Sequence, residues 1–269
     1  MKIIRFISKD NKTGYGAVET AKDKSARLVD GSIFEDFSLT ENLAVIKKIL
    51  PPVTPPNIIG IGLNYAGHAD ETGIKYPDIP VMFLKGTNAV IAAGDPIVLP
   101  EAGPEEVDYE AELAVIIGKT AKNVPEEKAF DYILGYCCAN DVSARDWQKH
   151  KQKKQWARGK SFDTFCPLGP WIVTKDEILN PNSLSIRSEL NEKMVQQSNT
   201  GDMIFDVPML IANLSRSMTL LPGTVILTGT PQGVGFTRQP PLFLGEGDEV
   251  TITIEKIGSL TNPVILEAL

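Results

Sequence analysis

Glycine and proline interrupt this chain so often that few segments are long enough to form an extended helix. The 269 residues include 22 Gly and 19 Pro. Both residue types break regular structure, glycine through its flexibility and proline through its missing N–H donor. The segments between them are short and rich in β-branched residues, which is typical of β-strands. These strand-like segments are residues 2–7, 15–18, 57–61, 81–84, 97–99, 110–117, 133–139, 171–173, 184–191, 224–228 and 250–255.

Three segments have helical patterns instead. Residues 206–221 begin with an Asp cap, carry apolar residues at helical spacing and are followed by a glycine. Residues 143–155 begin with a sequence similar to a capping box. Residues 41–50 end at a pair of prolines, which cannot continue a helix. Strands outnumber helices, so the sequence predicts a β-rich α+β fold with helices at its periphery.

A cluster of four prolines within residues 51–56 divides the chain into two parts. We expect a small N-terminal domain, residues 1–52, and a larger β-rich domain, residues 53–269. This division is consistent with the chain length, because a typical domain contains about 150 residues.

The composition excludes several classes of protein. The chain has 27 Lys+Arg against 34 Asp+Glu, a net charge of −7 and no long basic run, so a nucleic-acid partner is not expected. No apolar run approaches the ~20 residues that cross a bilayer, and the N-terminus has a strand pattern in place of a targeting peptide. Cys137, Cys138 and Cys166 lack the spacing of a disulfide framework or a zinc site. We therefore expect a cytoplasmic protein with core thiols and no membrane partner.

Three acidic residues near strand ends form the most informative pattern. Glu110 and Glu112 are two positions apart on a predicted strand, so their side chains share one face, with Cα atoms roughly 7 Å apart. Asp141 ends another apolar run. Carboxylates that enter a core need compensation, and an all-oxygen set suits Mg²⁺, Mn²⁺ or Ca²⁺ better than zinc. The alternative is a solvated strand face with Asp141 as a helix cap.

A glycine-containing segment carries a candidate acid–base pair. Gly60 and Gly62 follow a strand, but Tyr65 occupies the place of the third glycine of a dinucleotide-binding turn, and βαβ alternation is missing. That class is therefore excluded. His68 and Glu71 share one side of a helical turn, where the carboxylate would orient the imidazole as a base. A surface ion pair is the alternative.

Lys160 is a candidate for an interior position, because it follows a glycine and precedes an apolar stretch. Beside a metal and Arg158, a buried lysine would have its charged form disfavoured and could exchange a proton. An ordinary surface lysine is the alternative.

Residues 227–235 contain repeated glycines and Thr230 after an apolar strand. Such a loop lets a small anion approach the backbone closely, and the threonine hydroxyl adds a neutral donor. The segment lacks the Gly-Lys-Ser/Thr ending of a nucleotide P-loop. A turn without a ligand is the alternative.

The order of these motifs resembles the fumarylacetoacetate hydrolase superfamily, from about residue 56 to the C-terminus. The motifs are His-x-x-Glu, Glu-x-Glu, Asp-Val-Ser-Ala-Arg-Asp-Trp-Gln, Gly-Lys-Ser-Phe-Asp-Thr and Gly-Thr-Pro-x-Gly-Val-Gly. Residues 141–148, 160–170 and 197–200 are most similar to the fumarylacetoacetate hydrolase domain-containing protein two group. The hairpin at residues 190–193 departs from the Asn-Gly turn that is frequent in the family.

The resemblance implies a mixed β-roll, a small N-terminal domain and a homodimer. The lack of a mitochondrial presequence differs from the animal members and indicates a cytoplasmic protein. The implied roles are ligands of Mg²⁺ or Mn²⁺ (Glu110, Glu112, Asp141), a water-activating pair on a mobile lid (His68, Glu71), a lysine facing the substrate across the metal (Lys160) and contacts to the substrate's carboxylate or oxo group (Arg145, Gln148, Thr230).

We expect a metal-dependent enzyme that acts on small, enolisable 2-oxo (1,3-dicarbonyl) acids. A cation that chelates the carboxylate and 2-oxo oxygen would stabilise enolate charge by several kcal/mol. The group resembled favours keto–enol tautomerisation of oxaloacetate. The alternatives are C–C hydrolysis of acylpyruvates or fumarylpyruvate, and decarboxylation of oxaloacetate. The non-enzymatic alternative is a β-sandwich binding module stabilised by Ca²⁺.

Overall fold

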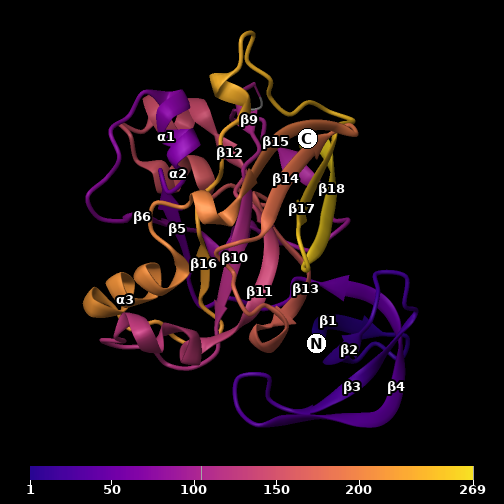
Figure 1. The fold of residues 1–269 in the computed structure, drawn as a ribbon. Helices are drawn as coiled ribbons and strands as arrows, with labels where there is room; N and C mark the ends of the chain where they lie inside the picture. Colours follow the sequence, from indigo (N-terminus) through magenta and orange to yellow (C-terminus); the bar gives the residue numbers. More distant parts are fainter. Residues whose placement is uncertain (104, 269) are drawn as a thin grey trace.

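The computed structural model describes residues 1–103 and 105–268, and its main element in those residues is a mixed 11-stranded sheet (Figure 1). The strand order is β2-β3-β4-β1-β13-β11-β10-β16-β5-β6, and β7 pairs with β13. The strands are β1 (Lys2–Ser8), β2 (Thr13–Val18), β3 (Ser25–Gly31), β4 (Phe37–Leu50), β5 (Ile58–Gly62), β6 (Val81–Lys85), β7 (Val90–Ile91), β10 (Ala111–Ile117), β11 (Ile133–Asn140), β13 (Cys166–Thr174) and β16 (Val225–Leu227).

A second sheet packs against the centre of the first. Its order is β15-β14-β17-β18-β8; β14 and β17 contact β10, and β17 and β18 contact β11. The side chains between the sheets form the core, and all of β10 is buried. These strands are β8 (Ile97–Leu99), β14 (Ser185–Leu190), β15 (Lys193–Asn199), β17 (Glu249–Ile254) and β18 (Gly258–Leu266), and β9 (Val107–Asp108) pairs separately with β12 (Ser143–Ala144).

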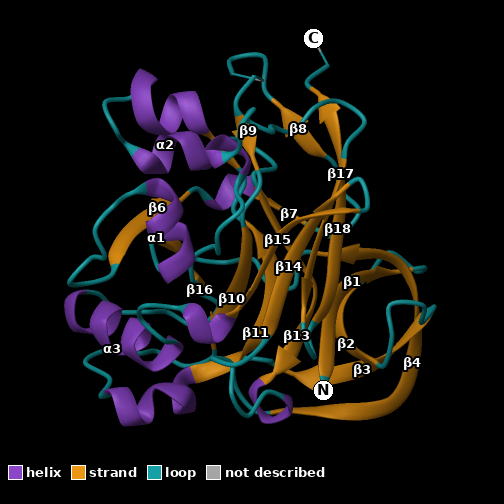
Figure 2. Ribbon diagram, turned by 45° about the horizontal axis from the view of Figure 1, so that its top comes forward, coloured by secondary structure: helices purple, strands orange, loops and turns teal. Residues whose placement is uncertain are grey.

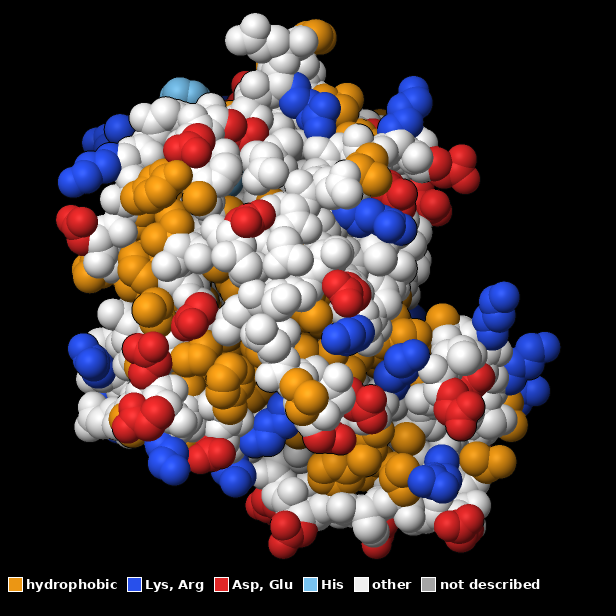
Figure 3. Space-filling view, in the orientation of Figure 1, with side chains coloured by type: hydrophobic (Ala, Val, Ile, Leu, Met, Phe, Trp, Pro, Cys, Tyr) orange, Lys and Arg blue, Asp and Glu red, His pale blue; other side chains and the backbone are white. Residues whose placement is uncertain are grey.

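Helices are short and gather on one side of the sheets (Figure 2). None of those in the described ranges is long and apolar enough to cross a membrane. They are α1 (Ala66–Thr72), α2 (Trp156–Lys160), α3 (Val207–Ser217), a π-helical turn (Trp147–Lys151) and the 3₁₀ turns Thr87–Ala89, Glu126–Tyr132, Lys175–Glu177, Thr200–Asp202 and Gly235–Thr237. The predicted β-rich α+β fold is confirmed. On the face drawn in Figure 3, acidic and basic side chains are interspersed.

The helix predicted over residues 41–50 is wrong, because these residues belong to β4. This strand pairs with both β1 and β3. Leu43 and Val45 are 70% and 42% exposed, whereas Ala44 and Ile46 pack against the core, so the segment alternates as a strand does. Two neighbouring strands override the helical propensity of the isolated sequence.

The helix predicted over residues 143–155 is also wrong at its start. Ser143 and Ala144 form β12, and the helical turn begins at Trp147, whose backbone N–H donates to Asp146. The Ser143 hydroxyl does not act as a helix cap, because it accepts from Lys160. The predicted helix over residues 206–221 is confirmed as α3 with Asp206 as its N-cap, although it ends earlier.

The N-terminal strands extend the main sheet to one edge, where Figure 1 shows them as a lobe. Among the residues that the structure describes, β1 alone joins this lobe to the rest of the sheet, through the pairs Lys2–Val173 and Ile3–Ile172 with β13. The side chains of Ile3, Ile4 and Phe6 are buried in the common core. The boundary near residue 52 remains a prediction.

Candidate functional site

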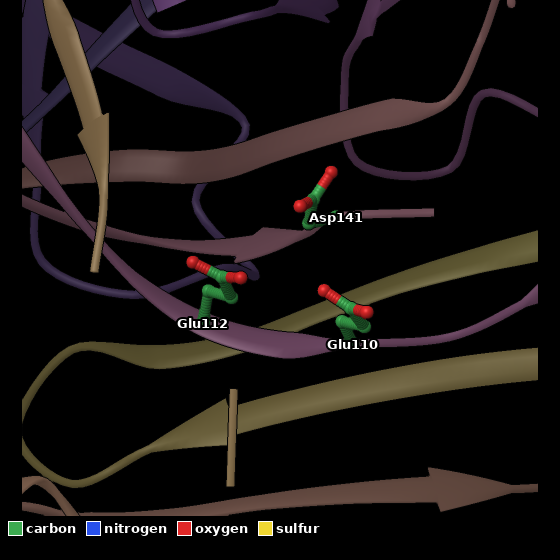
Figure 4. A group of neighbouring side chains, drawn as sticks. All are labelled: Glu110, Glu112 and Asp141. Carbon is green, nitrogen blue, oxygen red and sulfur yellow. The ribbon is translucent and has the colours of Figure 1, made fainter. Parts of the chain in front are cut away.

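The antiparallel pairing of β10 with β11 brings the three predicted acids together. Ala111 pairs with Asn140, so Glu110 and Asp141 are the next residues along the ladder, and the Asp141 N–H donates to the Glu110 carbonyl at 3.0 Å. Glu112 projects from β10 to the same side as Glu110 (Figure 4). Carboxylate oxygens of the three residues lie within 4.8 Å of one another.

Three buried cations surround two of these carboxylates. Lys160 Nζ lies 2.9 Å from Glu110 Oε2 and 2.5 Å from Asp141 Oδ2. Lys85 Nζ lies 2.6 Å from Asp141 Oδ1, and Arg145 Nη2 lies 2.7 Å from Glu110 Oε1. Burial raises the pKa of Glu110, but Lys160 and Arg145 outweigh it and hold that pKa at about 2.

Within the described part of the chain, the negative charge of Glu112 is not balanced by an ion pair with a neighbouring cation. The backbone N–H of Gly229 donates to Glu112 Oε2 at 2.7 Å. Burial and then the nearby Asp141 and Glu110 raise the pKa of Glu112 well above its ordinary value. A buried all-oxygen group with one unpaired negative charge fits a hard divalent cation such as Mg²⁺ or Mn²⁺.

Lys160 is buried as predicted, but its environment differs from the prediction. Arg158 does not lie beside it, because the Arg158 guanidinium stacks on Trp147 and Phe162. Burial lowers the pKa of Lys160, but the carboxylates of Asp141 and Glu110 outweigh it and raise that pKa. The sequence analysis expected the charged form of Lys160 to be disfavoured. The carboxylates of Asp141 and Glu110 instead stabilise the Lys160 ammonium, so that expectation is wrong.

These side chains face a cavity of about 390 Å³. Asp141 lies behind the residues that line it. Its inner end is almost fully buried and its walls are largely apolar, including Ile61, Phe83 and Trp156. A cavity of this kind suits a small organic acid whose charged end meets the polar groups. The predicted site residues that line the cavity are His68, Glu110, Glu112, Arg145, Gln148, Lys160 and Thr230.

His68 and Glu71, the predicted acid–base pair, lie in contact on helix α1. His68 Nδ1 lies 2.6 Å from Glu71 Oε1. The second oxygen of Glu71 accepts from the Gly233 N–H at 2.9 Å and from the Thr237 hydroxyl at 3.1 Å. This ties the pair to the glycine-rich loop and leaves Nε2 of His68 as the ring nitrogen available to the cavity.

The predicted substrate contacts are positioned by groups that the sequence did not reveal. Arg145 Nε donates to Asp108 at 2.9 Å, and its Nη1 donates to Gln148 at 2.9 Å. Thr230 accepts from Gln196 Nε2 at 2.8 Å. Of the residues missed, Lys85 had a visible signal, because it lies two positions after Phe83 on β6 and so shares its buried face.

Family models match nearly the whole chain. The fumarylacetoacetate (FAA) hydrolase C-terminal model matches residues 57–265, and the Rv2993c-like, N-terminal model matches residues 1–46. Over 219 residues the chain is 51% identical to oxaloacetate tautomerase fahd2, mitochondrial, of Xenopus laevis, which covers 81% of this chain and 68% of the relative.

Solved structures agree over nearly the full length. The 5-carboxymethyl-2-hydroxymuconate delta-isomerase from Mycobacterium smegmatis superposes with a TM-score of 0.87 at 40% identity, covering 99% of this chain and 100% of that one. The fumarylacetoacetate hydrolase from psychrophilic Exiguobacterium antarcticum gives 0.85 at 36% identity, with coverage of 99% and 100%. The motifs, the fold and these matches agree that the chain is an enzyme and belongs to the fumarylacetoacetate hydrolase family.

Proposed function

We propose that this enzyme interconverts the keto and enol forms of oxaloacetate, with a divalent cation held by Glu110, Glu112 and Asp141. The observation that carries this proposal is the position of Lys160, whose ammonium contacts two of these carboxylates and also lines the cavity. The name of the Xenopus relative, oxaloacetate tautomerase, supports the choice of reaction. Mg²⁺ or Mn²⁺ suits the oxygen ligands best, and Ca²⁺ is the hard-cation alternative.

Tautomerisation moves one proton from C3 of the substrate and places one on the 2-oxo oxygen. In this proposal His68 accepts the C3 proton at Nε2, because Glu71 holds Nδ1. Lys160 donates a proton to the 2-oxo oxygen as the enol forms. His68 then releases its proton to solvent, and solvent reprotonates Lys160. Arg145, Gln148 and Thr230 bind the substrate's oxygens. The cation, when bound, supplies Lewis-acid stabilisation of the developing negative charge.

Hydrolysis of a C–C bond is the second candidate, favoured by the His68–Glu71 pair. A histidine oriented by a carboxylate is the arrangement that activates water. The Exiguobacterium neighbour is named a fumarylacetoacetate hydrolase. Decarboxylation of oxaloacetate would use the same enolate. A non-catalytic β-sandwich binding module stabilised by Ca²⁺ is not favoured, because the chain belongs to an enzyme family.

A substrate panel separates these reactions. Oxaloacetate, acetylpyruvate, fumarylpyruvate and a 2-hydroxydienedioate are each assayed with and without Mg²⁺. The proposal expects metal-dependent loss of the oxaloacetate enol without release of CO₂. Release of pyruvate from acetylpyruvate would support hydrolysis, and release of CO₂ from oxaloacetate would support decarboxylation. If no compound is converted, the proposed function is wrong.

Replacement of Lys160 by methionine tests the central observation. We expect Lys160→Met to lower turnover of oxaloacetate by about 10²–10⁴-fold, the usual contribution of a general acid–base group. Metal binding, followed by thermal shift, should remain measurable because the three carboxylates are intact. Unchanged turnover would remove Lys160 from the mechanism.

The remaining properties also stay proposals. We propose a homodimer on the basis of the family, which sedimentation equilibrium would test. We also propose a cytoplasmic location, which localisation of the tagged protein would test, although the Xenopus relative is named mitochondrial.

A further inference from the structure

Lys149 brings an additional cation to the cavity. It belongs to the π-helical turn Trp147–Lys151 and lines the same cavity as Lys160. Its side chain is half-buried, and its Nζ lies 3.2 Å from the centroid of the Phe236 ring. The guanidinium carbon of Arg145 lies 4.5 Å from the same centroid. Two cations thus share one aromatic side chain at the wall of the cavity.

Lys149 differs from the other buried cations in having no carboxylate partner. Arg145 pairs with Asp108 and Glu110, and Lys160 pairs with Glu110 and Asp141. Among the residues whose positions are described, Lys149 makes no ion pair and no hydrogen bond. A half-buried ammonium that faces a cavity beside another cation favours the binding of an anion.

The position of Lys149 indicates which part of a ligand it would meet. The inner end of the cavity is formed by Glu110, Glu112 and Lys160, which are 5%, 1% and 2% exposed. His150 and Lys154 are exposed and mark its mouth. Lys149 is intermediate in exposure and next to His150 in the chain. A ligand that reaches the acids with one end would present its other end to Lys149.

We propose that Lys149 binds the distal carboxylate of the substrate and selects dicarboxylic over monocarboxylic 2-oxo acids. This inference rests on the proposed function, in which the 2-oxo end of the acid meets Lys160 and would meet a cation held by Glu110, Glu112 and Asp141. Burial and then the nearby Arg145 lower the pKa of Lys149 to about 8, so the group is still a cation at neutral pH. The carboxylates of Asp108, Glu106 and Glu110 act in the opposite direction.

Lys151 supplies a matched control. It lies two positions further along the same turn and has the same charge, but it is exposed, outside the cavity, and pairs with Asp146 at 2.6 Å. Lys151→Met therefore changes the overall charge as Lys149→Met does, without altering the cavity. Lys149→Arg keeps the charge and tests whether a cation is sufficient. Lys154→Met tests the other lysine that lines the mouth.

The experiment compares two stable 2-hydroxy acids, malate and lactate, by titration calorimetry of the full chain with Mg²⁺. We expect wild type to bind malate more tightly, and Lys149→Met to weaken malate binding about tenfold, as expected for a partly exposed charged contact, while lactate binding is unchanged. Lys151→Met and Lys154→Met should match wild type, and Lys149→Arg should keep most of the preference. In turnover of oxaloacetate, Lys149→Met should raise KM and leave kcat unchanged.

The outcomes separate this inference from the proposed function. If wild type binds lactate without preferring malate, or if Lys149→Met affects both acids equally or neither, the inference is wrong and the proposed function stands. An equal effect from Lys151→Met or Lys154→Met would also overturn it. If wild type binds neither acid and converts no 2-oxo acid, the proposed function is wrong and the inference falls with it.

Discussion

Glu112 carries an electrostatic cost that the chain's own groups do not offset. Glu112→Gln should therefore stabilise the metal-free protein, raising its Tm by a few degrees at pH 7, because the amide can still accept from Gly229 and can donate to the neighbouring carboxylates. The same change should abolish the rise in Tm that we expect Mg²⁺ to cause in wild type. Differential scanning calorimetry with and without a chelator measures both effects.

The stability that Glu112→Gln gains over wild type should depend on pH, because the pKa of Glu112 is raised. Above the ordinary value of 4.5 the unfolded chain ionises while the folded site resists ionisation, so wild type loses stability relative to Glu112→Gln as the pH rises. Below 4.5 the difference should disappear. Glu110→Gln is the control, and it should lower stability where Glu112→Gln raises it. It breaks the buried ion pairs of Glu110 with Lys160 and Arg145, so the free energy of unfolding should fall by about 3 kcal/mol. A stabilised Glu110→Gln would contradict this account.

The lowered pKa of Lys149 leads us to expect that substrate binding weakens at high pH. Its pKa of about 8 lies below the ordinary 10.5, so its charge is present below pH 8 and is lost as the pH rises through that value. We expect the KM for oxaloacetate to rise above pH 8 in wild type. In Lys149→Arg it should stay flat, because arginine remains charged. Identical profiles for the two proteins would contradict the prediction.

At the scale of elements, Gln196 on β15 makes hydrogen bonds to three other parts of the chain: β10, β14 and the glycine-rich loop. Its Oε1 accepts from the Ala111 N–H and from Ser188 Oγ, both at 2.9 Å. Its Nε2 donates to Thr230 Oγ1 at 2.8 Å and to the Pro231 carbonyl at 2.9 Å. A single amide thus fixes the start of β10 relative to β14 and to the glycine-rich loop, without being placed to touch substrate.

Gln196→Leu should leave these buried groups unpaired and cost about 3 kcal/mol of stability. We also expect kcat to fall, because β10 carries Glu110 and Glu112 and the loop carries Thr230. Gln197→Leu, on the exposed face of the same strand, is the matched control and should change neither quantity. Urea unfolding and steady-state kinetics measure the two effects, and equal behaviour of both variants would contradict a positioning role for Gln196.

The elements also show why part of the site was predictable and part was not. The alternation of strand side chains is local, so the shared face of Glu110 and Glu112 follows from spacing alone. The approach of Asp141 depends on β10 pairing with β11, and a single sequence does not specify strand partners. The helix over residues 41–50 failed for the same reason, since two partner strands decide that segment.

At the scale of the molecule, the N-terminal strands share their core with the rest of the chain. Ile3, Ile4 and Phe6 are buried in the common cluster, and Lys2 Nζ lies 4.8 Å over the ring of Trp171 on β13. We expect the full chain to unfold in urea in one transition, and a fragment of residues 53–269 to unfold at a lower urea concentration. Far-UV circular dichroism follows both, because all three tryptophans lie beyond residue 52. Two separate transitions would show that residues 1–52 fold independently.

The architecture as a whole was largely accessible from the sequence, whereas the charge balance of the site was not. Strand content follows from β-branched runs between glycines and prolines. Lys85, Asp108 and Gln196 reach the site from distant parts of the chain, and their roles arise from long-range packing. Lys160 shows the limit most clearly, because its burial was predictable but its carboxylate partners reversed the expected effect on its protonation.

Glu110 and Asp141 face each other one position beyond the Ala111–Asn140 pair that begins the ladder between β10 and β11. A slip of one residue in that ladder would turn both glutamates away from Asp141, so the acidic group exists only in one alignment of the hairpin. Insertions in the connection between the strands, residues 118–132, leave that alignment intact, whereas a single deletion within residues 112–117 destroys it. Insertions and deletions among related sequences should therefore occur within residues 118–132 and be absent from the paired residues of β10 and β11.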